Sequence, residues 1–107
     1  SEIDAAKALV AQDCRDAMAT VARGESLTVE QRIRVRRNHG FATQLLVAAV
    51  DRLFMATGGR GIYLDHDMQR LFRDVHAAAA HIGLSWEVTG TMWGQHRFGL
   101  PVGSQVF

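Results

Sequence analysis

The sequence has 107 residues, which is enough for one domain with a modest hydrophobic core. Apolar residues make up 48% of it and charged residues 21%, a composition typical of a globular and mainly helical protein. The formal net charge of +1, the lack of an apolar run long enough to span a bilayer and the lack of a signal-peptide pattern argue against nucleic-acid or membrane binding and favour a cytoplasmic protein.

The first predicted helix spans residues 2–23, and Gly24 ends it, as glycine commonly does just past a helix. Its apolar residues return at helical spacing: Ile3, Val10, Cys14, Ala17, Met18 and Val21. Cys14 is the only cysteine, which excludes an internal disulfide and a cysteine-based zinc site. Unpaired cysteines behave as small hydrophobic residues, so we expect Cys14 to be buried.

The second predicted helix spans residues 29–56 and begins at a capping box formed by Thr28 and Gln31. Its expected core face consists of Ile33, Phe41, Leu45, Ala48, Ala49, Leu53 and Phe54. Gly40 is a weak point in its middle, at a cost of about 1 kcal/mol relative to alanine. The arginines of 32-RIRVRR-37 fan around the helix, which indicates a solvated or salt-bridged surface and not a nucleic-acid-binding stripe.

A Gly-rich loop over residues 57–65 leads to a third predicted helix, which Asp65 caps and which runs to about Trp93. Its apolar stripe consists of Met68, Leu71, Phe72, Val75, Ala79, Ile82 and Trp86. The predicted fold is therefore all-α: an antiparallel helical bundle with three main helices, in one domain over residues 1–107. The chain has more aromatic and other apolar residues than a lone bundle can bury, which predicts a partner domain or subunit.

Four alanines separate His76 from His81 in the third predicted helix. The two histidines lie five residues apart, about 140° around a helix, which argues against a shared metal ion, and we expect no metal site. The alanines suit either close helix packing or an open space beside His81, whose imidazole can take a proton or hold an anion. The turn at 58-GGRG-61 is either a simple helix breaker or a phosphate site, and 90-GTMWG-94 favours close helix packing.

Residues 58–81, GGRGIYLDHDMQRLFRDVHAAAAH, resemble the C-terminal helical domain of the acyl-CoA dehydrogenase superfamily. The shared features are the Gly58–Gly59 turn and the following helix with the pair Arg73–Asp74. The resemblance extends from the first helix to about Gly94. It implies that the chain is the C-terminal part of a larger flavoenzyme, whose N-terminal helical and middle β-domains complete the active site. On this basis the 107 residues alone should have no turnover.

Dehydrogenases of this superfamily often carry a catalytic glutamate eight residues after the Asp of that pair. Here this position is Ile82, and Glu87 lies five residues further on. The departure resembles the oxygenase components of two-component flavin-dependent monooxygenases, in which a helix of the form RD-x-H/N-A-x-x-x-H carries a substrate-facing histidine. In this sequence that histidine is His81.

The resemblance to this branch implies hydroxylation of an aromatic, phenol-type substrate with O₂ and with reduced FMN or FAD from a separate reductase. His81 is the implied catalytic residue, as a general base or hydrogen-bond acceptor for the phenolic proton. Gly58, Gly59 and Arg60 are the implied flavin-binding residues, contacting the flavin phosphate of a neighbouring subunit in a homotetramer. Two alternatives remain: a dehydrogenase-like enzyme with its base elsewhere, and a non-catalytic helical oligomerisation module. For His76 we expect a structural role.

Overall fold

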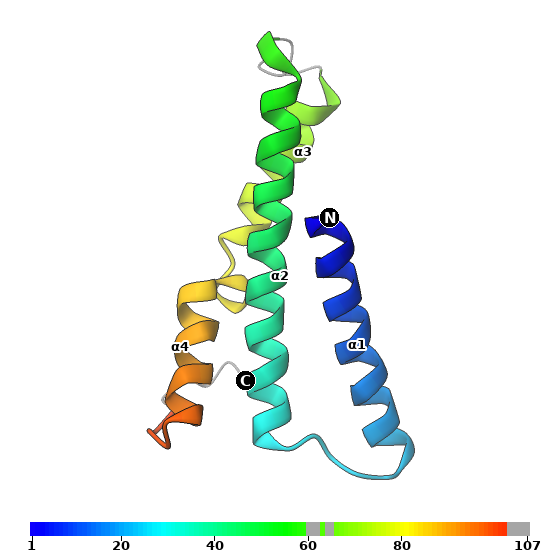
Figure 1. Ribbon diagram of the computed structural model, residues 1–107, viewed down its shortest axis with the longest axis vertical. Coiled ribbons are helices and arrows are strands. Elements are labelled where there is room, and N and C mark those ends of the chain that lie inside the picture. Colours follow the sequence, from blue (N-terminus) through cyan, green and yellow to red (C-terminus); the bar gives the residue numbers. More distant parts are fainter. Residues whose placement is uncertain (60–62, 64–65, 103–107) are drawn as a thin grey trace.

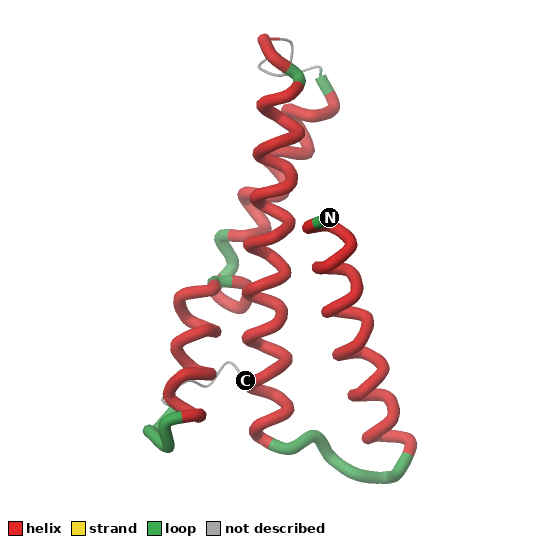
Figure 2. Tube along the Cα trace, in the orientation of Figure 1, coloured by secondary structure: helices red, strands yellow, loops and turns green. Residues whose placement is uncertain are grey.

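The computed structural model describes residues 1–59, 63 and 66–102 of the chain. They form four α-helices and one short 3₁₀ helix (Figures 1 and 2): α1 (Glu2–Ala22), α2 (Val29–Ala56), α3 (Asp67–Ala79), η2 (Ile82–Leu84) and α4 (Trp86–Arg97). No strand occurs among these residues. The all-α prediction is confirmed, as are the bounds of the second helix, and the first helix ends one residue before the predicted end.

Helix α2 is the central element of the fold, and each of the other helices packs against it. Figure 1 shows α1 and α4 beside the first half of α2 and α3 beside its second half, all three running opposite to α2. The resulting shape is elongated, with extents of 51 × 30 × 20 Å. Its narrow end is an arm formed by α2 and α3 alone (Figure 1).

The predicted capping box starts α2. The backbone N–H of Gln31 donates to Thr28 Oγ1 at 3.1 Å, and the Thr28 N–H donates to Gln31 Oε1 at 2.7 Å. These two bonds satisfy backbone groups that the helix itself leaves without partners.

Replacing Thr28 with alanine is expected to lower the free energy of unfolding by about 1 kcal/mol, because the amide of Gln31 loses its acceptor. Urea unfolding measures the change. Ser85 is the matched control, since it occupies the N-cap position of α4 but its side chain makes no capping hydrogen bond. Ser85→Ala should therefore change stability by less than about 0.5 kcal/mol. Equal losses in both variants would contradict the assignment.

Gly40 marks the closest approach of α2 and α4. A Cβ atom at this position would overlap Thr89 Oγ1 and lie 3.3 Å from the Cα of Trp86. Thr89 is 1% exposed, so it has no open space to move into. The glycine that weakens α2 as an isolated helix is thus the residue that allows α4 to dock.

Gly40→Ala is expected to lower the free energy of unfolding by about 1–2 kcal/mol, because overpacking against the α4 backbone outweighs the gain of about 1 kcal/mol in helix propensity. Gly94→Ala in α4 is the control, since a Cβ there meets no atom within 4 Å among the described residues. It should leave stability equal or raise it. Thermal unfolding of the two variants tests this, and a stabilised Gly40→Ala would refute the steric argument.

The expected close packing at 90-GTMWG-94 is wrong within the described chain. The nearest neighbour of a Cβ at Gly90 would be the Trp86 ring of its own helix, at 3.3 Å, and one at Gly94 would meet no described atom within 4 Å. The helix contact that needs glycine lies on α2 instead.

The single long third helix is also wrong, because the chain turns between α3 and α4. His81 caps the short η2 helix, Gly83 has a low helix propensity, and Ser85 takes the N-cap position of α4. His81 and Gly83 override the apolar periodicity, so Ile82 and Trp86 do not continue the stripe of α3. At the other end of α3, His66 is the N-cap, and Asp65 lies outside the described residues.

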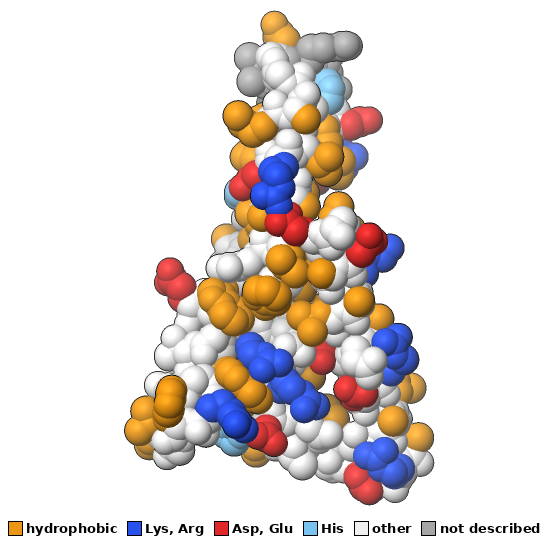
Figure 3. Space-filling view, viewed as in Figure 1, with side chains coloured by type: hydrophobic (Ala, Val, Ile, Leu, Met, Phe, Trp, Pro, Cys, Tyr) orange, Lys and Arg blue, Asp and Glu red, His pale blue; other side chains and the backbone are white. Residues whose placement is uncertain are grey.

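The core is smaller than the sequence predicts. The buried apolar residues are Ala6, Ile33, Ala42, Ala49 and Met92. Phe41 and Leu53, which were expected in the core, are 44% and 50% exposed, and Cys14 is exposed instead of buried. Large apolar side chains are spread over the surface (Figure 3), the most exposed being Met18, Val21, Met55, Tyr63 and Phe98. The other helices pack mainly against α2, and this one helix cannot bury all of their apolar side chains.

A buried polar network joins α1, α2 and α4. Asn38 Nδ2 donates to both oxygens of Asp13, at 2.9 and 3.2 Å, and Asn38 Oδ1 accepts from Arg37 Nε and Nη2, at 3.0 and 2.7 Å. The Arg37 guanidinium lies 4.3 Å from the centre of the Trp93 ring. Partial burial lowers the pKa of Arg37, the positive charge of Arg34 lowers it further, and Asp13 acts in the opposite direction.

Candidate functional site

The corner between α3 and α4 presents His81. The His81 side chain is exposed, and its Nδ1 accepts a hydrogen bond of 2.9 Å from the backbone N–H of Gly83. The His81 carbonyl in turn accepts from the N–H of Leu84 at 2.9 Å. His81 is therefore held by a local cap at a bend and not on the face of a continuous helix.

This cap fixes the tautomer of the neutral His81 ring. An Nδ1 atom that accepts a hydrogen bond carries no proton, so the proton of the neutral imidazole is on Nε2. The nitrogen left for a ligand is thus a donor. A ligand proton could be accepted at Nε2 only if the ring gave up its bond to Gly83.

Arg36 of α2 reaches the same corner. Its Nη1 atom lies 3.4 Å from the position that a Cβ atom of Gly83 would occupy, and the Nδ1 atom of His81 lies 3.1 Å from that position. Gly83 itself is buried. The arginine run was predicted to be solvated surface, but Arg36 is half-buried beside the predicted catalytic histidine.

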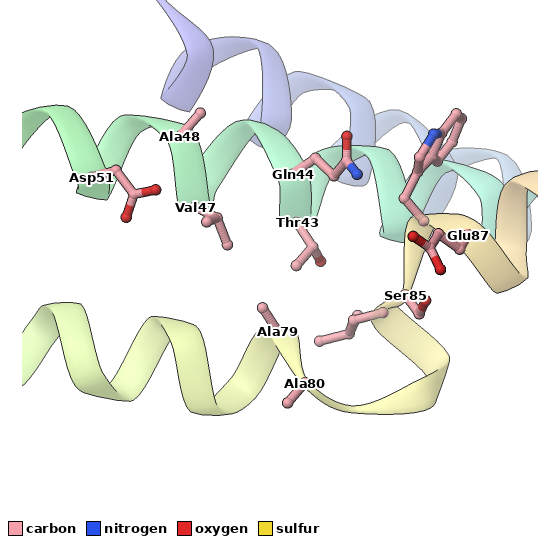
Figure 4. A pocket seen from close by; sticks show the side chains of 11 residues that line it. Thr43, Gln44, Val47, Ala48, Asp51, Ala79, Ala80, Ser85 and Glu87 are labelled. Atoms are coloured by element: carbon pink, nitrogen blue, oxygen red, sulfur yellow. The ribbon is translucent and has the colours of Figure 1, made fainter.

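A groove of about 490 Å³ separates α2 from α3 and the start of α4. Figure 4 shows Thr43, Val47 and Asp51 of α2 facing α3, with Ala79 pointing back toward them. The alanine run thus contributes Ala79 and Ala80 to an open groove, whereas the open space was expected beside His81. His81 is not among the residues that line it.

The charges that line the groove are acidic. Asp51 and Glu87 are its ionisable residues, with no basic residue in the lining. This composition does not suit the phosphate of a flavin. His76 Nε2 donates to Asp51 Oδ1 at 2.7 Å, and the His76 ring stacks on Phe72 with 4.4 Å between ring centres. This pair fastens α3 to α2, so the structure supports the structural role expected for His76.

The predicted flavin-binding turn lies at the far end of α3 from His81. Gly58 has a φ of +63°, and among the described residues a Cβ atom on Gly58 or Gly59 would meet no atom within 4 Å. The backbone of this turn is exposed, but the turn follows the C-terminus of α2 and is not the N-terminus of α3, which begins at Asp67. Arg60 lies outside the described residues. Helix α3 alone, at 13 residues, separates the turn from His81 by about 20 Å.

Two other classes of site are absent from the part of the chain that the structure describes. It contains no cluster of three or more His, Cys, Asp or Glu side chains that could hold a metal ion. No helix within residues 1–59 and 66–102 is long and apolar enough to cross a membrane.

Comparison with known proteins identifies the domain. Residues 1–86 match the family described as acyl-CoA dehydrogenase, C-terminal domain. The chain belongs to this family. The match includes all of α1, α2, α3 and η2, and therefore both the Gly58–Gly59 turn and the His81 corner.

Several relatives among characterised proteins are oxygenase components. The flavin-dependent monooxygenase oxygenase subunit HsaA of Mycobacterium tuberculosis is 37% identical over 103 residues, which is 96% of this chain and 26% of that protein. The oxygenase component of an FADH₂-dependent resorcinol hydroxylase from Rhizobium sp. is 36% identical over 104 residues, 94% of this chain and 25% of that protein.

The fold agrees with these sequence matches. The crystal structure of 3-HSA hydroxylase from Rhodococcus sp. RHA1 superimposes with a TM-score of 0.92 and 32% identity, covering 100% of this chain and 28% of that one. The chain thus spans about a quarter of the length of the proteins it matches.

Proposed function

We propose that the chain is the C-terminal domain of the oxygenase component of a two-component flavin-dependent monooxygenase, which hydroxylates an aromatic, phenol-type substrate. The observation that carries the proposal is the alignment with oxygenase components, which covers 94–96% of this chain. One of these components is named for resorcinol, a phenol. The substrate-facing histidine expected in that branch is present as His81. A separate reductase would supply the reduced flavin.

Reduced FMN or FAD supplies the chemistry of oxygen activation when it is bound. In this chain, Gly58 and Gly59 would hold its phosphate through their exposed backbone, as the resemblance to the family implies. The turn and His81 of one chain are separated by about 20 Å, which supports their belonging to two different active sites. Each active site would then take the turn from one subunit and the histidine from another.

A homotetramer is part of the proposal. Its support is the exposed apolar surface, which includes Met18 and Val21 on α1 and Met55 on α2, each at least 60% exposed. Surfaces of this kind mark contacts with other domains or subunits.

The role of His81 is hydrogen-bond donation to the substrate oxygen. The sequence-based prediction made His81 a base or acceptor, but the bond from the Gly83 N–H to Nδ1 leaves Nε2–H as the group that meets a ligand. A donor at this place stabilises negative charge on a phenolic oxygen, and that charge makes the ring more electron-rich for oxygen transfer.

Rapid mixing of the full-length protein tests the proposed function. The protein is loaded anaerobically with reduced FMN or FAD, mixed with oxygenated buffer without substrate, and followed by absorption. A transient spectrum that differs from those of reduced and oxidised flavin is expected. Direct return to oxidised flavin would contradict the proposal and favour a dehydrogenase-like enzyme or a non-catalytic module.

A further inference from the structure

We infer that Arg36 and His81 form an anion-binding pair at the α3–α4 corner, which holds the ionised phenolic oxygen of the substrate. The inference rests on the proposed function for the identity of the ligand. Its physical basis is the environment of Arg36, which the sequence alone assigned to a solvated helix surface.

Both side chains converge on one backbone position. Arg36 Nη1 lies 3.4 Å from the Cβ position of Gly83, and the Nδ1 and Cε1 atoms of the His81 ring lie 3.1 and 3.2 Å from it. A Cβ atom at position 83 would be tight against the His81 ring and in ordinary contact with the guanidinium. Glycine therefore allows a cation from α2 and an imidazole from the α3–α4 corner to approach each other.

Arg36 has no counter-charge within the described part of the chain. It makes no ion pair or hydrogen bond there, whereas Arg52 pairs with Glu2 and Arg97 with Glu30. The buried carboxylate of Asp13 already accepts two bonds from Asn38. The half-buried guanidinium therefore offers donors to an anionic oxygen, and hydrogen bonds between charged groups are among the stronger ones.

Each group has an accessible side. His81 is exposed, and Arg36 lines a hollow of about 540 Å³ between α1 and α2, in whose lining His81 takes no part. Ala17, Leu27 and Val35 give this hollow apolar walls, and Asp13 and His39 also line it. An aromatic ring next to an ionised oxygen matches this combination of apolar surface and positive charge.

The pair offers donors only. A guanidinium has no acceptor, and His81 directs Nε2–H outward because its Nδ1 is bonded to Gly83. A neutral phenol would need an acceptor for its O–H, which neither group supplies. An ionised phenol accepts from both, so the pair selects the phenolate, and the phenolic proton passes to solvent.

The test is the ionisation of a chromogenic phenol, 4-nitrophenol, bound to the full-length protein in the absence of reduced flavin. The visible absorption of the phenolate is recorded against pH for the parent and for Arg36→Gln, Arg36→Lys and Arg32→Gln. Arg32 is the matched control because it belongs to the same arginine run and lines the same hollow, but is exposed.

The parent protein is expected to bind 4-nitrophenol as the phenolate even below the pH at which free 4-nitrophenol ionises in water. Arg36→Gln should raise the ionisation pH of the bound probe by about one unit, which is a tenfold change in the equilibrium. Arg36→Lys should keep most of the effect, and Arg32→Gln all of it. An unchanged ionisation in Arg36→Gln, an equal shift in Arg32→Gln, or no phenolate binding by the parent would each overturn the inference.

This outcome is separate from that of the proposed function. The oxygen reaction of the bound flavin is followed without any phenol, so it succeeds or fails independently of Arg36. If the transient flavin spectrum appears but the ionisation pH of 4-nitrophenol does not shift, the protein is a monooxygenase that recognises its substrate at another place.

Discussion

Replacing His81 with asparagine in the full-length protein is expected to lower the rate of hydroxylation by about 100-fold, the usual effect of removing one donor to a developing oxyanion. Asparagine retains an oxygen near the position of Nδ1, so the Gly83 N–H keeps its acceptor and the corner keeps its shape. What is lost is the outward Nε2–H. Flavin binding should be unchanged, because the Gly58–Gly59 turn, and not His81, is proposed to hold the flavin phosphate.

His81→Gln is the matched variant, since its side-chain amide reaches the position of Nε2 but its oxygen cannot also reach Gly83. It should recover part of the rate if donation to the substrate is the role of His81. Product formation and flavin affinity are measured together for parent and variants. Equal rates in the parent and His81→Asn would remove His81 from the mechanism, and a parallel loss of flavin affinity would show a structural role instead.

Replacing Asn38 with alanine is expected to lower the free energy of unfolding by about 3 kcal/mol. The carboxylate of Asp13 is 7% exposed and receives both of its hydrogen bonds from Asn38. The alanine variant would leave this buried charge without a donor, and Arg37 would lose its acceptor as well. Urea unfolding of the chain measures the loss.

A double-mutant cycle separates two costs: that of leaving the Asp13 carboxylate without a donor, and that of losing the Asn38 side chain. Asp13→Ala combined with Asn38→Ala should lose less than the two single variants added together, because no buried carboxylate remains. Gln12→Ala removes an exposed side-chain hydrogen bond in the same helix, to Asp16, and should cost less than about 0.5 kcal/mol. Additive losses in the cycle would show that the Asp13–Asn38 contact contributes little.

The packing of α4 and the candidate anion site depend on one stretch of α2. Arg36 and Gly40 are four residues apart and so lie on the same face of the helix, with Arg36 next to Gly83 and Gly40 next to Thr89. The glycine that admits α4 therefore also sets the distance between the guanidinium and the corner. For this reason Gly40→Ala should disturb the site as well as stability.

The sequence by itself determined the features that depend on neighbouring residues. The apolar spacing and Gly24 placed α1, and the Thr28–Gln31 capping box placed the start of α2, because helix formation and capping act over only a few residues. The Gly58–Gly59 turn and the Arg73–Asp74 helix were enough for the family, which the match over residues 1–86 confirms.

The tertiary structure decided what depends on packing between distant segments. Apolar periodicity predicted a continuous third helix, but a single bond from Gly83 to His81 and the docking of α4 on Gly40 bend the chain there. Phe41 and Leu53 follow the same periodicity as true core residues, yet the described helices leave them 44% and 50% exposed. Arg36 reads as one arginine in a run of charged surface until α3 and α4 bring His81 to it. Spacing along one helix predicts which residues share a face, whereas burial and pairing depend on which segment packs against that face.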